Sequence, residues 1–157
     1  MTESPWHKEI KNWGVATEIP LGNRRADCML RCGERAEIQA RPLTSAEVAG
    51  REAQADLWIL DCRAAYRTDR LLVWDDPDFG QLFRWDRAWQ GFAVAKRPVF
   101  LNLEMDISTG HGSFLQVTGW AFNGHRALGS GHPHTATAMR SWMRYDIPLT
   151  AHPAVTR

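Results

Sequence analysis

Apolar residues follow a helical period at the start of the chain and then alternate with polar residues along short segments. Pro5 after Ser4 predicts a helix over residues 5–12, because serine caps a helix start and proline suits its first turn. One face of that helix is apolar and carries Trp6, Ile10 and Trp13. The alternating segments predict strands over residues 15–21, 25–30 and 35–40.

The last two of these strands predict a β-hairpin around the turn Arg31-Cys32-Gly33-Glu34. Side chains alternate along a strand, so Glu37 and Gln39 share one face of the hairpin. Asp27 joins that face only if it lies opposite one of them, which requires a three-residue loop or a bulge, with Gly33 at positive φ. Two carboxylates that converge beside an amide form a site for a hard divalent cation.

The remainder of the chain predicts further helices and strands with long loops between them. Thr44 and Glu47 form a capping box that opens a helix to about residue 55, and the apolar run at 57–61 indicates a strand buried on both faces. Further along, we expect a turn over 75–78, a strand over 98–105, a loop-rich segment with glycines between 110 and 131, and a short helix over 135–144.

Composition places the chain in the class of soluble globular proteins. Its 157 residues, 44% hydrophobic and 24% charged, suit one domain with a sizeable core. The net charge of +1 gives no overall attraction for nucleic acid, so DNA binding needs a local basic patch. The three cysteines form no paired framework and no apolar run could span a membrane, so we expect reduced thiols and a cytoplasmic location without membrane attachment.

Aromatic and histidine residues suggest less about function. The eight tryptophans predict aromatic packing, with Trp85 and Trp89 as candidates for stacking on bases because they lie among polar residues. His125, His132 and His134 are interpreted as part of a flexible loop, because glycine and proline flank them and structural zinc usually needs four ligands.

Four motifs stand in a fixed order in the first part of the chain: Ser4-Pro5-Trp6-His7 with Lys11, Arg24-Arg25-Ala26-Asp27, Glu37-Ile38-Gln39, and Leu57-Trp58-Ile59-Leu60-Asp61 after a helix with Arg51-Glu52. With these motifs, the stretch from Trp6 to Asp61, about a third of the chain, resembles the competence protein CoiA-like nucleases, a branch of the PD-(D/E)XK nuclease superfamily. A weaker echo of the family is Lys96-Arg97-Pro98-Val99-Phe100-Leu101. Gln39 stands where the superfamily usually has lysine, as is common in this branch.

The resemblance implies an α/β (α+β) fold with a restriction-endonuclease-like αβββαβ core over residues 4–74. Residues 75–150 would then be a loop-rich extension with an extra strand and a short helix, and 151–157 a frayed tail of the same single domain. The implied substrate is DNA, and the implied cofactor is Mg²⁺ or Mn²⁺ held by Asp27 and Glu37. The implied catalytic residues are Asp27, Glu37, Gln39, His7 and Lys11, and the implied DNA contacts are Arg24, Arg25, Arg41 and Arg51.

The expected roles follow from the chemistry of each side chain. Gln39 cannot carry the charge of lysine, but it can position the attacking water by hydrogen bonding. His7 and Lys11, one helical turn apart, would contact phosphate or assist proton transfer. A further carboxylate near the metal could come from Glu3, Glu9 or Glu18.

Two classes of function stay open at this point. The first is a metal-dependent endo- or exonuclease, and the second is a protein of the same fold that binds nucleic acid or a protein partner without cutting. A solvated sheet face whose acids pair with arginine is the plainest explanation of Asp27 and Glu37 taken alone. A small-molecule enzyme lacks support, because the chain has no glycine-rich phosphate loop, nucleophile elbow or dinucleotide fingerprint. Strand preference, and whether a homodimer or a partner subunit is needed, also stay open.

Overall fold

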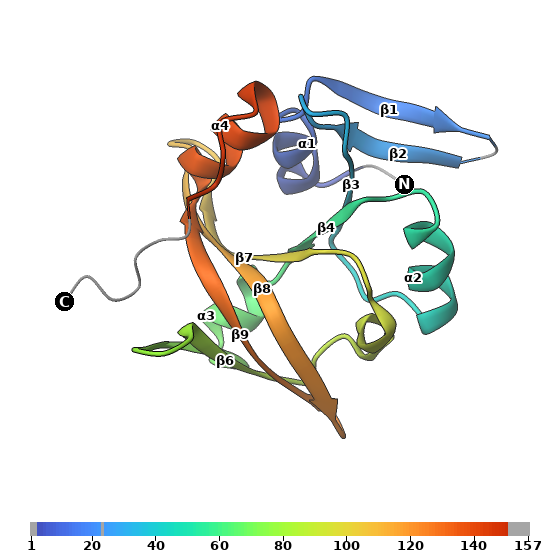
Figure 1. Ribbon diagram of the computed structural model, residues 1–157. Coiled ribbons are helices and arrows are strands. Elements are labelled where there is room, and N and C mark those ends of the chain that lie inside the picture. Colours follow the sequence, from blue (N-terminus) through green and yellow to red (C-terminus); the bar gives the residue numbers. More distant parts are fainter. Residues whose placement is uncertain (1–2, 23, 151–157) are drawn as a thin grey trace.

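The computed structural model describes residues 3–22 and 24–150, and it shows a mixed α+β protein built on one open sheet (Figure 1). The strand order is β1-β2-β3-β4-β7-β8-β9-β6-β5. Only the pairs β3–β4 and β4–β7 are parallel, and the other neighbours are antiparallel. The 151–157 segment, expected to be a frayed tail, lies outside the described residues.

The first half of the chain follows the order α1, β1, β2, β3, α2, β4. Ser4 caps α1 by accepting a hydrogen bond from the His7 N–H, and the predicted capping box of Thr44 and Glu47 opens α2. The predictions for these elements are therefore confirmed to within a few residues. Their bounds are α1 (Pro5–Lys11), β1 (Ala16–Leu21), β2 (Arg24–Met29), β3 (Arg35–Gln39), α2 (Ser45–Glu52) and β4 (Leu57–Asp61).

The second half contains far more regular structure than the sequence led us to expect. Strands occupy most of the segment predicted to be loop-rich, and the predicted strand over 98–105 and helix over 135–144 are confirmed. The turn predicted over 75–78 lies at 77–79, between β5 and β6, and Oδ1 of Asp76 accepts two backbone N–H groups there. The elements are α3 (Arg63–Arg67), β5 (Leu71–Asp76), β6 (Gly80–Asp86), the 3₁₀ helix η1 (Gln90–Val94), β7 (Val99–Asp106), β8 (His111–Asn123), β9 (Arg126–Thr135) and α4 (Ala136–Tyr145).

Gly112, Gly129 and Gly131 mark close approach between strands, which is the physical reason that the loop prediction was wrong. A Cβ atom on Gly129 would lie 2.4 Å from the carbonyl oxygen of Gly119 and 2.6 Å from the ring of Phe83. These glycines therefore let β9 pass closely over its neighbours. His132 and His134 lie within β9, so the flexible loop expected for them is also wrong.

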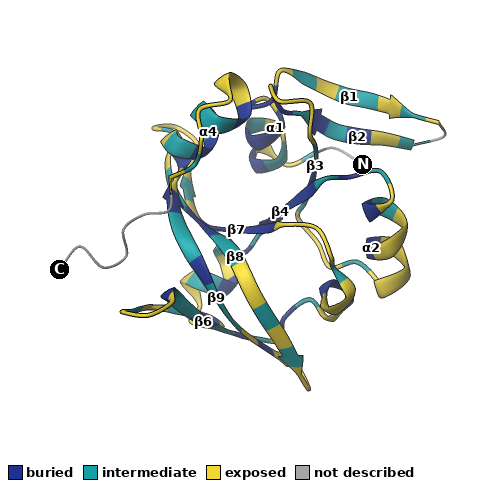
Figure 2. Ribbon diagram, viewed as in Figure 1, coloured by how far each residue is buried: buried dark blue, intermediate teal, exposed yellow. Residues whose placement is uncertain are grey.

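Apolar side chains fill both faces of the sheet. On one face, α1 and α4 cover a core that includes Ile38, Leu57 and Ile59, whereas α2, α3 and η1 cover the other face (Figures 1 and 2). Because Leu57 and Ile59 belong to one core and Trp58 and Leu60 to the other, β4 is buried on both faces, as predicted. The acids of the hairpin lie near one end of this double core.

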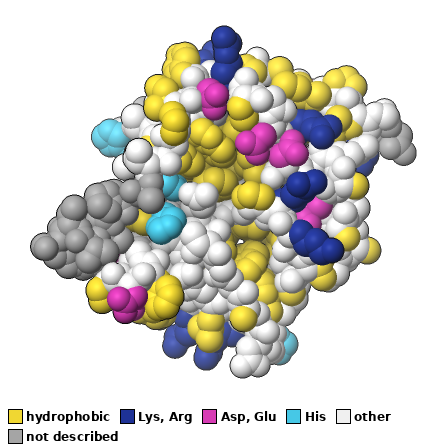
Figure 3. All heavy atoms as spheres, viewed as in Figure 1, with side chains coloured by type: hydrophobic (Ala, Val, Ile, Leu, Met, Phe, Trp, Pro, Cys, Tyr) yellow, Lys and Arg dark blue, Asp and Glu magenta, His cyan; other side chains and the backbone are white. Residues whose placement is uncertain are grey.

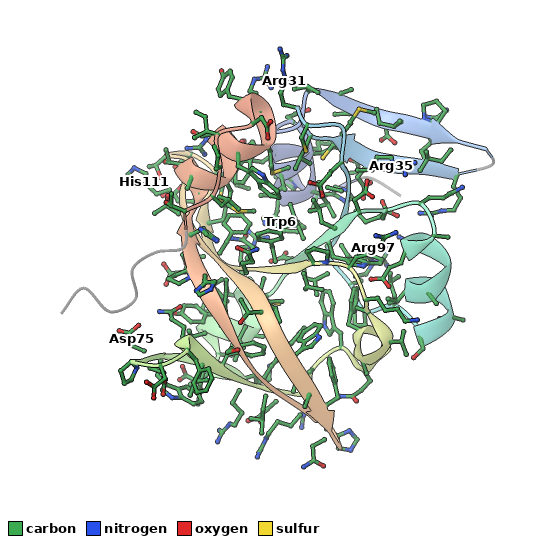
Figure 4. All side chains as sticks on the ribbon, in the orientation of Figure 1. Trp6, Arg31, Arg35, Asp75, Arg97 and His111 are labelled. Carbon is green, nitrogen blue, oxygen red and sulfur yellow. The ribbon has the colours of Figure 1, made fainter. Side chains whose placement is uncertain are left out.

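Tryptophans serve mainly as packing in these cores. Trp6 and Trp13 are buried, and the side chain of Trp6 points from α1 into the molecule (Figure 4). Trp85 is also buried, and its ring centroid lies 5.7 Å from that of the half-buried Trp89. The prediction that Trp85 is open for base stacking is therefore wrong, and only Trp89 keeps an accessible part.

Candidate functional site

The register of the hairpin decides whether its acids can meet. Cys28 pairs with Ala36 and Met29 with Arg35, so Asp27 comes opposite Glu37. The N–H of Leu30 donates to the carbonyl of Glu34, which leaves a three-residue loop, and Gly33 in that loop has φ 97°. The predicted loop length, register and glycine conformation are all confirmed.

Asp27 lies where β2 and β3 separate. The two strands pair only near the turn, at Cys28–Ala36 and Met29–Arg35. Just past these pairs, Oδ2 of Asp27 accepts a hydrogen bond from the N–H of Ile38 at 2.8 Å. The carboxylate thus satisfies a backbone donor that the ladder leaves unpaired. Through the same gap, His7 of α1 places its Nε2 atom 3.2 Å from Oδ1 of Asp27, as expected for the helix face that excludes Trp6.

Glu37 is the most enclosed acid of the site, with 2% of its surface exposed. Its Oε1 atom accepts a hydrogen bond from Nη2 of Arg24 at 2.5 Å, and Nη1 of Arg51 lies 3.9 Å away. The same Arg51 atom donates to Oε1 of Gln39 at 3.2 Å. Two arginines therefore hold the Glu-x-Gln motif from β2 and α2, and one of the expected DNA contacts, Arg24, is engaged by the acid itself.

The two carboxyl groups influence each other's pKa. Burial, together with the charge of Asp27, raises the pKa of Glu37 to about 7 against the opposing effect of Arg24. Burial also acts to raise the pKa of Asp27, but His7, the Ile38 N–H and the Glu37 hydroxyl outweigh it and lower that pKa. The contact with Asp27 in turn raises the pKa of His7. The charge of Asp27 therefore favours protonation of both of its neighbours, Glu37 and His7.

Lys11 lies on the same helix but is committed to other acids. Its Nζ atom bonds to Oε1 of Glu3 and to Oε1 of Glu18, each at 2.5 Å. Glu18, at φ 53°, departs from strand geometry to make this contact. Glu9 instead accepts the indole N–H of Trp13. The structure thus brings His7 to Asp27, but it places Lys11 in a separate ion-pair cluster with two of the three further acids considered.

The remaining predicted DNA contacts lie at the edge of this region. Arg25 is exposed on β2, opposite Pro20 of β1, and Arg41 is exposed just beyond the end of β3. Figure 3 shows acidic and basic side chains intermixed on the side of the molecule that carries β3 and α2. The resemblance implied that Arg24 and Arg51 face DNA. In the structure, Arg24 bonds to Glu37, and Arg51 lies between Glu37 and Gln39. The sequence does not indicate which arginines make these contacts.

The donor chemistry suits a magnesium-type ion. The two adjacent carboxylates are hard oxygen ligands, and Mg²⁺ commonly uses one or two carboxylates and keeps several waters. The amide oxygen of Gln39 already accepts a hydrogen bond from Arg51. Within the described residues, no group of three or more His, Cys, Asp and Glu side chains is placed to hold a metal. A cation would therefore be held by the Asp27–Glu37 pair with water and substrate.

No protein-family model, curated protein or solved structure matches this chain. In the described part of the chain, no helix is both long enough and apolar enough to cross a membrane.

Proposed function

We propose that this protein is a divalent-metal-dependent nuclease that hydrolyses phosphodiester bonds in DNA on a restriction-endonuclease-like αβββαβ core. The observation that carries the proposal is the position of Asp27 on β2 opposite Glu37 on β3, with Gln39 beside them. This arrangement lies within the element order α1, β1, β2, β3, α2, β4. The resemblance of the four sequence motifs to CoiA-like nucleases supports the same interpretation.

Each side chain has a role that its contacts allow. Asp27 and Glu37 would hold Mg²⁺ or Mn²⁺, which when bound supplies Lewis-acid activation of water and of the scissile phosphate. A cation bound to the Glu37 carboxylate would compete with Arg24, and the displaced guanidinium could then meet a phosphate oxygen. His7 beside Asp27 can donate a proton or a hydrogen bond. Gln39, whose amide oxygen is fixed by Arg51, has its amide N–H₂ to orient water.

The decisive experiment is nicking of circular plasmid DNA and of circular single-stranded DNA in Mg²⁺, Mn²⁺ or chelator. We expect cleavage only with metal, and we expect Asp27→Asn and Glu37→Gln to abolish it because each removes a charge that holds the cation. Gln39→Ala is expected to reduce the rate by about 10- to 100-fold, since positioning of water is one contribution among several. Glu34→Gln, on the exposed turn of the same hairpin, is the matched control and should cut like wild type.

A second candidate function has its own observation. Arg24 and His7 already neutralise the acid pair, which is also how a noncatalytic scaffold would stabilise buried carboxylates. Such a protein would bind nucleic acid or a protein partner without cutting. Equal nicking by wild type and an Asp27→Asn/Glu37→Gln double variant would reveal a contaminant. Absence of nicking by both, with every metal and DNA form, would favour this second function.

A further inference from the structure

A cavity of about 300 Å³ lies beyond the acid pair, at the ends of β3 and β4. We call it the basic pocket. Its walls come from α3, from the start of β5 and from the segment that joins β6 to η1, so that residues distant in the sequence meet there. The residues that line the basic pocket include Arg63, Arg67, Arg70, Arg87, Asp61 and Trp89.

Positive charge is concentrated in the basic pocket. Four arginines and one aspartate line it, an excess of 4 − 1 = 3 positive charges, whereas the whole chain carries +1. The aspartate, Asp61, is used by Arg63 through paired contacts of 2.8 and 3.0 Å. Among the described residues, Arg67, Arg70 and Arg87 form no ion pair. These guanidinium groups are therefore available to an anionic ligand.

The fold holds these arginines together by specific contacts. The carbonyl of Arg70 accepts the N–H of Asp86 at 2.7 Å, which fixes the backbone before Arg87 beside the start of β5. Arg87 has φ 56°, a left-handed conformation that is unfavourable for a non-glycine residue. The ion pair with Asp61 and the ring of Trp6, 5.5 Å from the guanidinium carbon, fix Arg63 in turn. Arg63 and the backbone of Arg87 therefore have defined positions beside the cavity.

The aromatic wall and the size of the cavity narrow the ligand class. Trp89 is half-buried and lines the cavity, so part of its ring is available for stacking. A volume of about 300 Å³ is at the small end for ligand pockets, and it suits one nucleotide rather than a duplex. Planar guanidinium groups bind phosphate oxygens through paired hydrogen bonds.

The basic pocket is also a neighbour of the acid pair. Ala40, which lines it, directly follows Gln39 of the Glu-x-Gln motif. Arg63, on another wall, packs on Trp6, and the next residue of α1 is His7, which contacts Asp27. A DNA strand whose end lies in the basic pocket can therefore continue toward Asp27 and Glu37.

We propose that the basic pocket binds the phosphate-bearing terminal nucleotide of a DNA strand, with the phosphate on the arginines and the base against Trp89. The identity of the ligand as a DNA end rests on the proposed nuclease function. The anion site itself rests on the arginines and the cavity. Binding can be measured in chelator, where no cleavage occurs, so the two proposals can fail independently.

The experiment compares single-stranded oligonucleotides that carry a 5′-phosphate, a 3′-phosphate or only hydroxyl ends, with a fluorophore at the other end and anisotropy as the readout. We expect one phosphorylated form to bind about 10-fold or more tighter than the hydroxyl form, as for one or two charge-assisted hydrogen bonds. A nucleoside monophosphate should displace the labelled oligonucleotide better than inorganic phosphate, because its base stacks on Trp89. The free nucleoside should displace it least.

The variant Arg67→Gln/Arg87→Gln is expected to abolish the preference for a phosphorylated end. Both side chains are exposed, and equal thermal unfolding midpoints would show that the fold is retained. The matched control is Arg31→Gln/Arg97→Gln, which removes the same charge at exposed positions elsewhere on the surface and should keep the preference (Figure 4). Equal affinity for phosphorylated and hydroxyl ends, or an unchanged preference in Arg67→Gln/Arg87→Gln, would overturn the proposal. Circular plasmid has no ends, so its nicking tests the acid pair separately.

Discussion

Replacement of Glu37 by glutamine is expected to stabilise the protein at high pH and to leave its stability unchanged at low pH. The pKa of Glu37 is raised from 4.5 to about 7, so the folded state binds a proton that the unfolded chain has released. A carboxyl with a raised pKa favours folding most below pH 4.5, and this advantage is lost as the pH rises through 7. Glutamine keeps the shape and the neutral charge of the protonated acid at every pH.

The size of the effect follows from the shift. A pKa that rises from 4.5 to about 7 corresponds to roughly 3 kcal/mol of lost folding stability once Glu37 is ionised. For a domain of this size that is about 6–12 °C in the unfolding midpoint. Glutamine retains the contacts of the neutral acid, because its Oε1 accepts from Arg24 and its N–H₂ can donate to Asp27.

The assay is urea and thermal unfolding of wild type and Glu37→Gln in chelator, at intervals from pH 4 to pH 9. We expect similar stability at pH 4, an advantage for the variant that grows between pH 4.5 and about 7, and a constant advantage above that range. Glu34→Gln, exposed on the same hairpin, should follow wild type throughout. Parallel pH profiles for wild type and Glu37→Gln, or a variant that is less stable at pH 8, would refute the assignment of a buried Glu37 with a raised pKa.

Two further predictions concern packing and thiol reactivity. Gly91→Ala should destabilise the protein by about 1–3 kcal/mol or prevent folding, because the new Cβ would lie 1.9 Å from the carbonyl oxygen of Leu43. Urea unfolding measures this change. An unchanged unfolding midpoint would contradict the packing of η1 on the loop before α2. Of the three free cysteines, only Cys32 is exposed, and burial raises the pKa of the Cys28 thiol to about 12. Mass spectrometry after maleimide treatment at pH 7 should therefore show one label on native protein and three in urea, and rapid triple labelling of native protein would disprove the burial.

Local signals in the sequence were sufficient for the first half of the fold. The cap at Ser4, the capping box at Thr44 and Glu47, and the apolar run at 57–61 each specify an element through contacts within a few residues. The position of Asp27 opposite Glu37 was also predictable, because side-chain alternation leaves only a few registers for a hairpin of this length.

Contacts between distant segments account for the rest. Glycine at 129 and 131 suggests a loop locally, but in the sheet it permits close crossing of β8, β9 and β6. Arg24 was expected to face DNA, whereas the structure directs it to Glu37. The basic pocket was not predicted at all, because its arginines come from segments that only the tertiary fold brings together.

The place of β7 in the sheet has a consequence for how the chain matures on the ribosome. Strands β1 to β4 emerge first, yet the outer edge of β4 pairs with β7, and the core beneath α1 is closed by Ala136, Met139 and Met143 of α4, the last helix. The N-terminal half, residues 4–74, therefore leaves the exit tunnel with one edge of the apolar strand β4 unpaired and with an open core. Such long-range closure slows folding and exposes nascent chains to aggregation. The acid pair is assembled from the first third of the chain, but its scaffold is complete only when synthesis is nearly finished.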